Sequence, residues 1–363
     1  MVEQELSKYK NKKLLFIFLF VFTFLNPYLI YQIGNNLSFF PIYESQLELA
    51  RHLNTIHKTA GETEMQEEQQ KIILFLEQTK HYLEEGDYNG LLNLRIAEAQ
   101  RNLQRTNGGV TTTETRKFLF QEITIRERGL IYIPRLDAVP RTMPMWNYFG
   151  KLFSLFNNNI YFLCALWVAI AFSFESRANL KDLTNIAPVS LLKLFFFKWF
   201  LNITILSAIV IIAFIISSIF IILVNGIGSR NYPIAINVGI NEFAIKDISV
   251  IVLENFGFVF LWITAISALG LFISLFVNHL VLQFIFLFSV FFLLGEGNIN
   301  SYFPTSWQRF LPMNYLNFPA VVSREDYNHL LGIYTENGFL TLSLLTIIFL
   351  SLTAICLKIR KKW

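Results

Sequence analysis

Long apolar segments alternate with polar ones along this chain. Six segments contain few or no ionisable residues: 14–33, 155–174, 194–224, 248–277, 280–295 and 338–357. An α-helix rises about 1.5 Å per residue, so about 20 apolar residues cross the hydrocarbon core of a bilayer. Segment 280–295 is short for this and would need a neighbouring helix, a thin membrane patch or a re-entrant path. The pattern predicts an all-α integral membrane protein with six transmembrane helices.

The polar segments between these helices predict the orientation. Lys and Arg cluster just before the first span, just after the last, and between the second and third, which places both termini in the cytoplasm. The predicted connections are a cytoplasmic N-terminus 1–13, an extracellular helical domain 34–153, a cytoplasmic connection 175–193, an extracellular loop 225–247, an extracellular or re-entrant segment 296–337 and a cytoplasmic tail 358–363.

Composition supports a membrane location. Hydrophobic residues make up 54% of the chain and charged residues only 15%, whereas soluble domains have about 25% charged residues. The net charge of +4 comes from basic residues beside the spans, so we expect membrane lipid and not nucleic acid as a partner. Segment 34–153 lacks cysteine, because Cys164 and Cys356 both lie in spans. With the abundant Phe, Ile, Asn and Lys, this favours the cell membrane of a bacterium.

The segment 34–153 carries helical patterns. One face of a helix is predicted by the spacing of Leu92, Ile96, Ala99 and Leu103. The run Gly86–Gly90 predicts the turn of a helical hairpin, and a further helix is expected from Thr113 to Arg128, ended by Gly129. Three prolines predict an extended conformation for 130–144. We therefore expect a mainly helical extracellular domain.

Isolated polar and aromatic residues suggest little chemistry. His52, His57 and His81 match no zinc-binding spacing, so neither a metal site nor a catalytic site is predicted. Glu254 is expected in the headgroup zone, because the membrane-crossing part of segment 248–277 can begin at Phe256. Gly257 and Gly270 would allow close approach between helices. An interfacial aromatic belt is predicted from Tyr302, Phe303, Trp307 and Phe310.

The connection 175–193 reads as a short amphipathic helix between two spans. Glu175 and Arg177 follow the second span, Lys181 and Asp182 lie on the polar side, and Pro188 ends the helix. Ser190 can cap the next helix.

This connection resembles that of the ABC-2 class of ABC transporter permeases. Members show an acidic residue after the second span, a leucine-rich amphipathic helix, a Pro-Val-Ser-like step and a Lys about ten residues after that proline. Pro188, Val189, Ser190 and Lys198 fit this step. Ser176-Arg177-Ala178 stands where members often have Gly-Thr after the acidic residue. The run Leu311–Leu316 before the last span is similar to a second family feature.

The resemblance implies a permease with no ATPase activity of its own. ATP would be bound by separate ATP-binding cassette subunits, and the chain itself has no phosphate-binding G-x-x-x-x-G-K-[ST] motif and needs no cofactor. A second permease subunit, identical or different, would complete the pathway. The cargo would be an exported peptide, lipid-linked molecule or antimicrobial compound. The residues that would contact the ATPase are Glu175, Arg177, Lys181, Asp182, Pro188 and Ser190.

Two other functions remain open. The extracellular helical domain could bind a ligand or partner protein, which would make the chain a membrane receptor or sensor, although its cytoplasmic segments are short. An integral-membrane enzyme acting on lipid or glycan is the other alternative, but no convergent His, Asp or Glu pairs lie near the predicted membrane faces.

Overall fold

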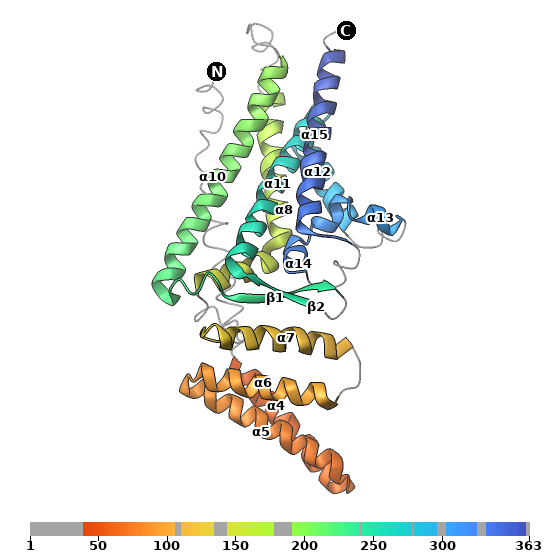
Figure 1. The fold of residues 1–363 in the computed structure, drawn as a ribbon. Helices are drawn as coiled ribbons and strands as arrows, with labels where there is room; N and C mark the ends of the chain where they lie inside the picture. The colour runs from red at the N-terminus through yellow and green to blue at the C-terminus, as the bar shows by residue number, and fades with distance from the viewer. Residues whose placement is uncertain are drawn as a thin grey trace. The chain divides into compact units, whose positions relative to one another are not determined.

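The computed structural model describes residues 39–105, 110–133, 144–177, 191–239, 242–277, 279–295, 303–324 and 332–360. These residues are mostly helical (Figure 1). The chain divides into two compact units. Among the described residues, the bundle unit comprises those within 149–217 and 250–360, and the mixed unit comprises those within 39–148 and 218–249. The predicted N-terminus 1–13, the first span 14–33, most of the connection 175–193 and the last three residues of the predicted tail 358–363 lie outside the described residues.

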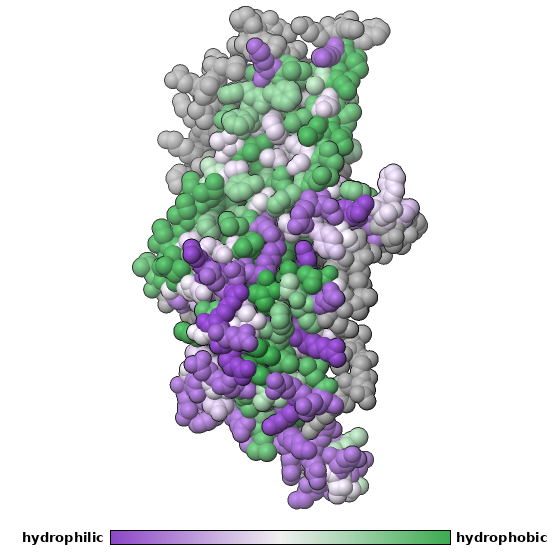
Figure 2. Space-filling view, in the orientation of Figure 1, coloured by the Kyte–Doolittle hydropathy of each residue, from purple (hydrophilic) through white to green (hydrophobic). Residues whose placement is uncertain are grey.

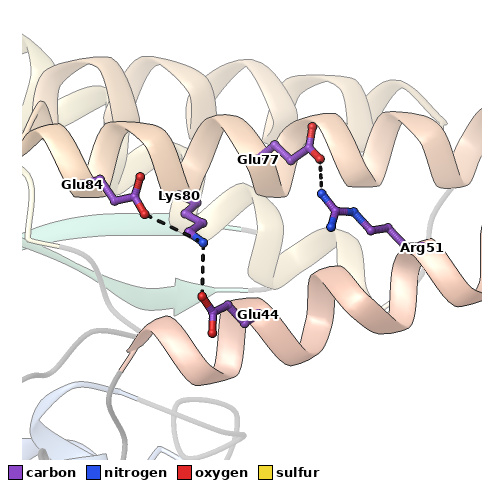
Figure 3. A network of polar contacts seen from close by, with 5 residues as sticks. All are labelled: Glu44, Arg51, Glu77, Lys80 and Glu84. Carbon is purple, nitrogen blue, oxygen red and sulfur yellow. Dashed lines mark hydrogen bonds and ion pairs between the residues drawn. The ribbon is translucent and has the colours of Figure 1, made fainter.

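Four helices form most of the mixed unit: α4 (Phe39–Ala60), α5 (Thr63–Glu85), α6 (Tyr88–Arg105) and α7 (Val110–Glu127). Leu47 and Ala50 of α4 pack with Leu76 of α5 in a small apolar core. Ion pairs flank this core on the surface, where Arg51 contacts Glu77 at 2.7 Å and Lys80 contacts Glu44 at 3.2 Å (Figure 3). Exposed pairs of this kind add little stability, so the apolar contacts hold the two helices together.

The predicted turn after α5 is shorter than expected. Gly86 adopts a left-handed conformation with φ of 70°, and its N–H is bonded to the Leu83 carbonyl oxygen. Asp87 Oδ1 then accepts the Gly90 N–H at 2.9 Å, which caps the next helix. Helix α6 therefore begins at Tyr88, and the last residues of the predicted turn belong to its first turn.

Helix α7 ends close to the predicted residue. It closes at Glu127, and Gly129 follows with φ of 61° and its N–H bonded to the Arg126 carbonyl at 3.0 Å. Glycine is favoured there because a side chain would strain that left-handed conformation.

The expectation of an all-α fold is wrong in the segment 225–247. Strands β1 (Pro233–Gly239) and β2 (Glu242–Asp247) form an antiparallel hairpin where the sequence indicated only a loop. The Ala235 N–H donates to Gln121 Oε1 at 3.2 Å, and Arg128 donates to Asp247 Oδ1 at 2.7 Å. Two short strands are marginal alone, and their contacts with α7 supply the support that local sequence does not reveal.

Five helices dominate the bundle unit: α8 (Met145–Arg177), α10 (Leu191–Asn225), α11 (Ile248–Ser274), α12 (Leu280–Gly295) and α15 (Thr335–Arg360). Three stretches are long and apolar enough to cross a membrane, namely Leu192–Leu223, Ile248–Ser274 and Thr335–Ile359. Shorter apolar stretches lie at Tyr161–Phe172 and Leu280–Ser289. These helices indicate a membrane protein, and the full count of six spans stays a prediction.

The long helices present apolar side chains outward. Figure 2 shows apolar residues, in green, over the visible face of α10 and α15. The exposed large side chains include Phe200, Ile211, Ile212, Ile215 and Ile216 on α10, and Leu340, Leu344, Ile347, Ile348 and Ile355 on α15. Contiguous apolar surface of this kind suits contact with lipid chains.

Between α12 and α15 the chain forms short helical pieces: α13 (Thr305–Gln308), the 3₁₀ turn η3 (Pro312–Tyr315) and α14 (Phe318–Val322). Every residue of α14 is buried, and the Phe318 ring stacks on Phe258 of α11 with centroids 5.6 Å apart. This part of the predicted segment 296–337 is therefore packed into the bundle unit.

Candidate functional site

The predicted contact site for an ATPase is largely outside the described residues. This applies to Lys181, Asp182, Pro188 and Ser190, and the side chains of Glu175 and Arg177, at the end of α8, are also outside them. The arrangement of these six residues therefore stays a prediction. Helix α10 begins at Leu191, directly after the predicted cap Ser190.

The Lys that belongs to the family-like step is described. Lys198 lies on the third turn of α10, is buried, and places its ammonium nitrogen 5.6 Å from the Phe195 ring centroid. A cation over an aromatic face gains electrostatic stabilisation, and this gain is larger when water is excluded. Lys193, one turn earlier in α10, is exposed.

A polar seam crosses the middle of the bundle unit. Trp167 Nε1 of α8 donates to Asn202 Oδ1 of α10 at 2.9 Å, and Asn202 Nδ2 donates to Ser267 Oγ of α11 at 2.9 Å. Asn202 and Ser267 have no exposed surface. A buried polar group without a hydrogen bond costs free energy in an apolar environment. The three helices are therefore stabilised in the register in which these hydrogen bonds form.

Helix α12 joins the same bundle through a second polar contact. Gln283 Nε2 donates to the Gly270 carbonyl of α11 at 3.1 Å, and the Gln283 side chain is fully buried. Gly270 has Val168 of α8 so close that a methyl group in place of its hydrogen would overlap the Val168 side chain. Gly257 likewise lies against the Phe339 ring of α15. Both glycines allow the close helix approach expected of them.

Two buried aromatic side chains hold the segment between α12 and α15. Trp262 Nε1 of α11 donates to the Tyr315 carbonyl at 3.1 Å, and Tyr161 Oη of α8 donates to the Leu316 carbonyl at 2.7 Å. The two rings also meet edge to face, with centroids 5.0 Å apart. The carbonyl groups at the end of the 3₁₀ turn η3 are thus satisfied by side chains of neighbouring helices.

Glu254 lies inside the helix that covers the predicted span 248–277. Helix α11 already begins at Ile248, so Glu254 lies in its second turn, partly buried. Thr335 Oγ1, at the start of α15, donates to Glu254 Oε2 at 3.2 Å. Strand β2 leads directly into α11, so the helix begins at the first residue of the predicted span 248–277. The place of Glu254 in the headgroup zone stays a prediction.

The titratable side chains of the mixed unit serve its packing. Glu122 of α7 is buried and accepts from Arg95 Nε of α6 at 3.0 Å and from Tyr132 Oη at 3.2 Å. Burial raises the pKa of Tyr132 above its ordinary value, against the opposing effect of Arg95. Of the three predicted surface histidines, His52 and His81 are exposed, and His57 Nδ1 lies 2.6 Å from Glu62 Oε2.

The described residues contain no group of His, Cys, Asp and Glu that could hold a metal ion. The arrangement they do form binds helices to each other through neutral hydrogen bonds and aromatic packing. Sequence reasoning missed the polar seam, although one signal was present. Asn202, Ser267 and Gln283 are isolated polar residues inside strongly apolar stretches, and such residues usually face the interior of a bundle.

Comparisons of this chain with protein-family models, with curated proteins and with solved structures found no match. The helical bundle and its polar seam are therefore interpreted on their own geometry.

Proposed function

We propose that this chain is the membrane permease subunit of an ATP-driven ABC transporter of the ABC-2 class. It lies in the cell membrane of a bacterium with both termini in the cytoplasm, pairs with ATP-binding cassette subunits and a second permease subunit, and exports a peptide, a lipid-linked molecule or an antimicrobial compound. ATP hydrolysis takes place in the partner subunits.

The observation that carries the proposal is the step from Pro188 to Lys198. A proline and a serine precede a long apolar helix that begins at Leu191, and a buried Lys follows two turns into that helix. A proline ends one helix and a serine favours the start of the next, so a rigid connection can form at the cytoplasmic end of α10. A rigid connection can transmit a conformational change from a bound ATPase to the helices of the bundle.

The bundle unit supports this proposal physically. Its helices are joined by the neutral polar seam and by close glycine contacts, so a displacement at one helix end is passed on through packed side chains. Such a bundle can move as rigid parts, as alternating access to a transport pathway requires.

A receptor or sensor is the second candidate. It is favoured by the mixed unit, a compact part of the chain with its own apolar core and its own buried ion pair. In the transporter proposal this unit is an extracellular addition to the permease, and in the receptor alternative it is the ligand-binding part.

Co-purification from the native host with the candidate ATPase tests the proposal, together with ATPase turnover in lipid. Lys181→Glu and Asp182→Lys should each reduce the yield of the complex and uncouple turnover, because a charge left unpaired in an interface costs several kcal/mol. Lys58→Glu on α4 is the matched control, since it reverses an exposed charge in the mixed unit and should change neither quantity.

Two outcomes would contradict the proposal in different ways. Unchanged complex yield and turnover in both variants, with the protein folded, would show that this connection is not the contact. If the wild-type chain brings down no ATPase at all, the transporter proposal fails and the receptor alternative takes its place.

A further inference from the structure

The segment Phe303–Leu316 of the bundle unit is a rigidly built platform. Gln308 Nε2 donates to the Phe303 carbonyl at 3.2 Å, Asn314 Nδ2 donates to the Gln308 carbonyl at 2.6 Å, and Tyr315 Oη donates to the Arg309 carbonyl. Each bond ties a side chain to the backbone five or six residues away. The segment is therefore folded by its own polar side chains.

The platform is also anchored to helix α11 and packs against the first turn of helix α15. Its Tyr315 is fully buried, and the Trp262 indole of α11 donates to its carbonyl at 3.1 Å. A methyl group on Gly338 would lie 2.5 Å from Tyr315 Cδ1 and 2.7 Å from Phe258 of α11. Gly338 stands in the first turn of α15, a helix long and apolar enough to cross a membrane. The platform thus lies beside the N-terminal end of a membrane-spanning helix.

What the platform displays differs from what it buries. Trp307 is 64% exposed, Phe310 46% and Phe303 38%. The exposed Arg309 places its guanidinium carbon 4.9 Å from the Phe310 ring centroid. The internal hydrogen bonds prevent the aromatic rings from folding back into the bundle, and leaving three such rings in water is unfavourable.

These side chains match the chemistry of the boundary between lipid headgroups and acyl chains. A Trp ring favours this zone because its ring is apolar and its N–H is polar, the Phe rings add apolar surface, and Arg can bind phosphate oxygens with two parallel hydrogen bonds. The apolar outer face of α15 adjoins the same end of the bundle unit and continues toward the acyl chains. Lipid is therefore the partner that fits both the rings and the cation.

We propose that the platform binds phospholipid through its part Phe303–Phe310: Trp307 and Phe310 insert at the headgroup boundary, and Arg309 binds the phosphate of a lipid, with a preference for anionic lipids. This lipid site is independent of any ATPase partner, so it stands or falls separately from the transporter proposal.

Depth-dependent fluorescence quenching tests the insertion. The full chain is reconstituted in phosphatidylcholine vesicles, and the signal of Trp307 is obtained as the difference between wild type and Trp307→Phe. We expect phosphatidylcholine brominated near the headgroup to quench this signal at least twofold more than aqueous iodide does. Trp167→Phe is the control, because Trp167 is buried away from the platform and its signal should respond weakly to both quenchers. Strong quenching of the Trp307 signal by iodide, without quenching by the brominated lipid, would overturn the proposal.

Lipid titration tests the role of Arg309. The purified full chain is titrated with phosphatidylglycerol, and bound lipid is counted by native mass spectrometry. Arg309→Gln should weaken the tightest binding about fivefold, as loss of one basic residue near an anionic surface does. Arg101→Gln on α6, which also removes an exposed arginine, should leave it unchanged. Inorganic phosphate at equal concentration should not compete. Equal affinities for the Arg309 variant and the wild type, or displacement by phosphate, would show that no lipid phosphate is held there.

Discussion

The most deeply buried hydrogen-bonded side chains differ in kind between the two units of this chain. In the mixed unit a carboxylate is buried: Glu122 has a side chain only 6% exposed and is paired with Arg95 at 3.0 Å and bonded to Tyr132. In the bundle unit the most deeply buried bonded side chains are neutral, as Asn202 and Ser267 illustrate.

This difference follows from the surroundings in which each unit can fold. A charge can be buried at the edge of a small helical domain because its partner Arg95 still reaches water, with 24% of its side chain exposed. Between helices whose outer faces are apolar, a buried charge has no partner that reaches water. A hydrogen bond between neutral groups therefore costs less free energy to bury than an ion pair does. Loss of a partner should consequently harm the mixed unit more than the bundle unit.

The sharpest test removes the partner of the buried carboxylate. Arg95→Leu should lower the free energy of unfolding of the mixed unit by about 3–5 kcal/mol, because Glu122 is left buried without its cation. Hydrogen exchange of the α6 and α7 amides in the full chain measures this change. Arg101→Leu on the same helix is the control: its pair with Glu98, at 3.6 Å, is exposed and should contribute less than about 1 kcal/mol. Similar losses in both variants would show that burial of the pair does not matter.

In the bundle unit, close packing should matter more than any one polar contact. Gly270→Ala places a methyl group against Val168 and should destabilise the protein by about 1–3 kcal/mol in thermal unfolding in detergent. Val168→Ala in the same chain makes room for that methyl group, so the double variant should be more stable than the sum of the two single changes implies. Strict additivity would mean that α8 and α11 do not meet at this glycine.

Alkaline pH should destabilise the mixed unit through a buried tyrosine. Burial raises the pKa of Tyr132, so this tyrosine stays protonated in the folded mixed unit when it ionises in the unfolded chain. Its contribution is intact below the ordinary tyrosine pKa of about 10, and above it the free energy of unfolding should fall by about 1.4 kcal/mol per pH unit.

Urea unfolding of the full chain between pH 7 and 11 measures this dependence. Above pH 10, Tyr132→Phe should reduce the slope of the free energy of unfolding against pH by the contribution of one proton, about 1.4 kcal/mol per pH unit. Between pH 7 and 9, the difference in free energy of unfolding between the variant and the wild type should stay constant. An unchanged slope above pH 10 in the variant would contradict the assignment to Tyr132.

The smallest effect is expected in the polar seam. Asn202→Ala removes the hydrogen bonds to Trp167 and Ser267 and should cost about 0.6–1.7 kcal/mol, the range for single polar contacts between membrane helices. Thermal unfolding in detergent measures it, with Thr204→Ala as the control, because Thr204 is exposed two residues further along α10. A loss as large as that of Arg95→Leu would remove the contrast between the units.

Local patterns in the sequence predicted much of the helical structure. Helix α12 occupies Leu280–Gly295, the range predicted from its apolar run, and α7 stops before Gly129, where a left-handed conformation is required. These features depend on hydrophobic composition and on the conformational preferences of single residues, which are readable along the chain. Their crossing of a membrane stays a prediction for α12.

The pairing of distant residues could not be predicted in this way. Strand β1 is supported by Gln121, which lies 114 positions away from Ala235, and the Trp262 indole finds a carbonyl 53 positions away at Tyr315. The spacing of apolar and polar residues along the sequence does not identify partners so far apart. The same polar residue type also occurs in loops and on helix surfaces, so composition alone does not show which one is buried.

By itself the sequence determined that this is a chain of long apolar helices with a polar helical insertion. Charged residues are costly in an apolar environment, so the segments that lack them mark the apolar helices. Only the tertiary structure decided which polar groups meet: Asn202 with Trp167 and Ser267, Glu122 with Arg95, and the platform carbonyls with Trp262 and Tyr161. The physical reason is that burial energy depends on the amount of apolar surface, which composition reports, whereas a hydrogen bond depends on the position of its partner, which only the folded chain provides.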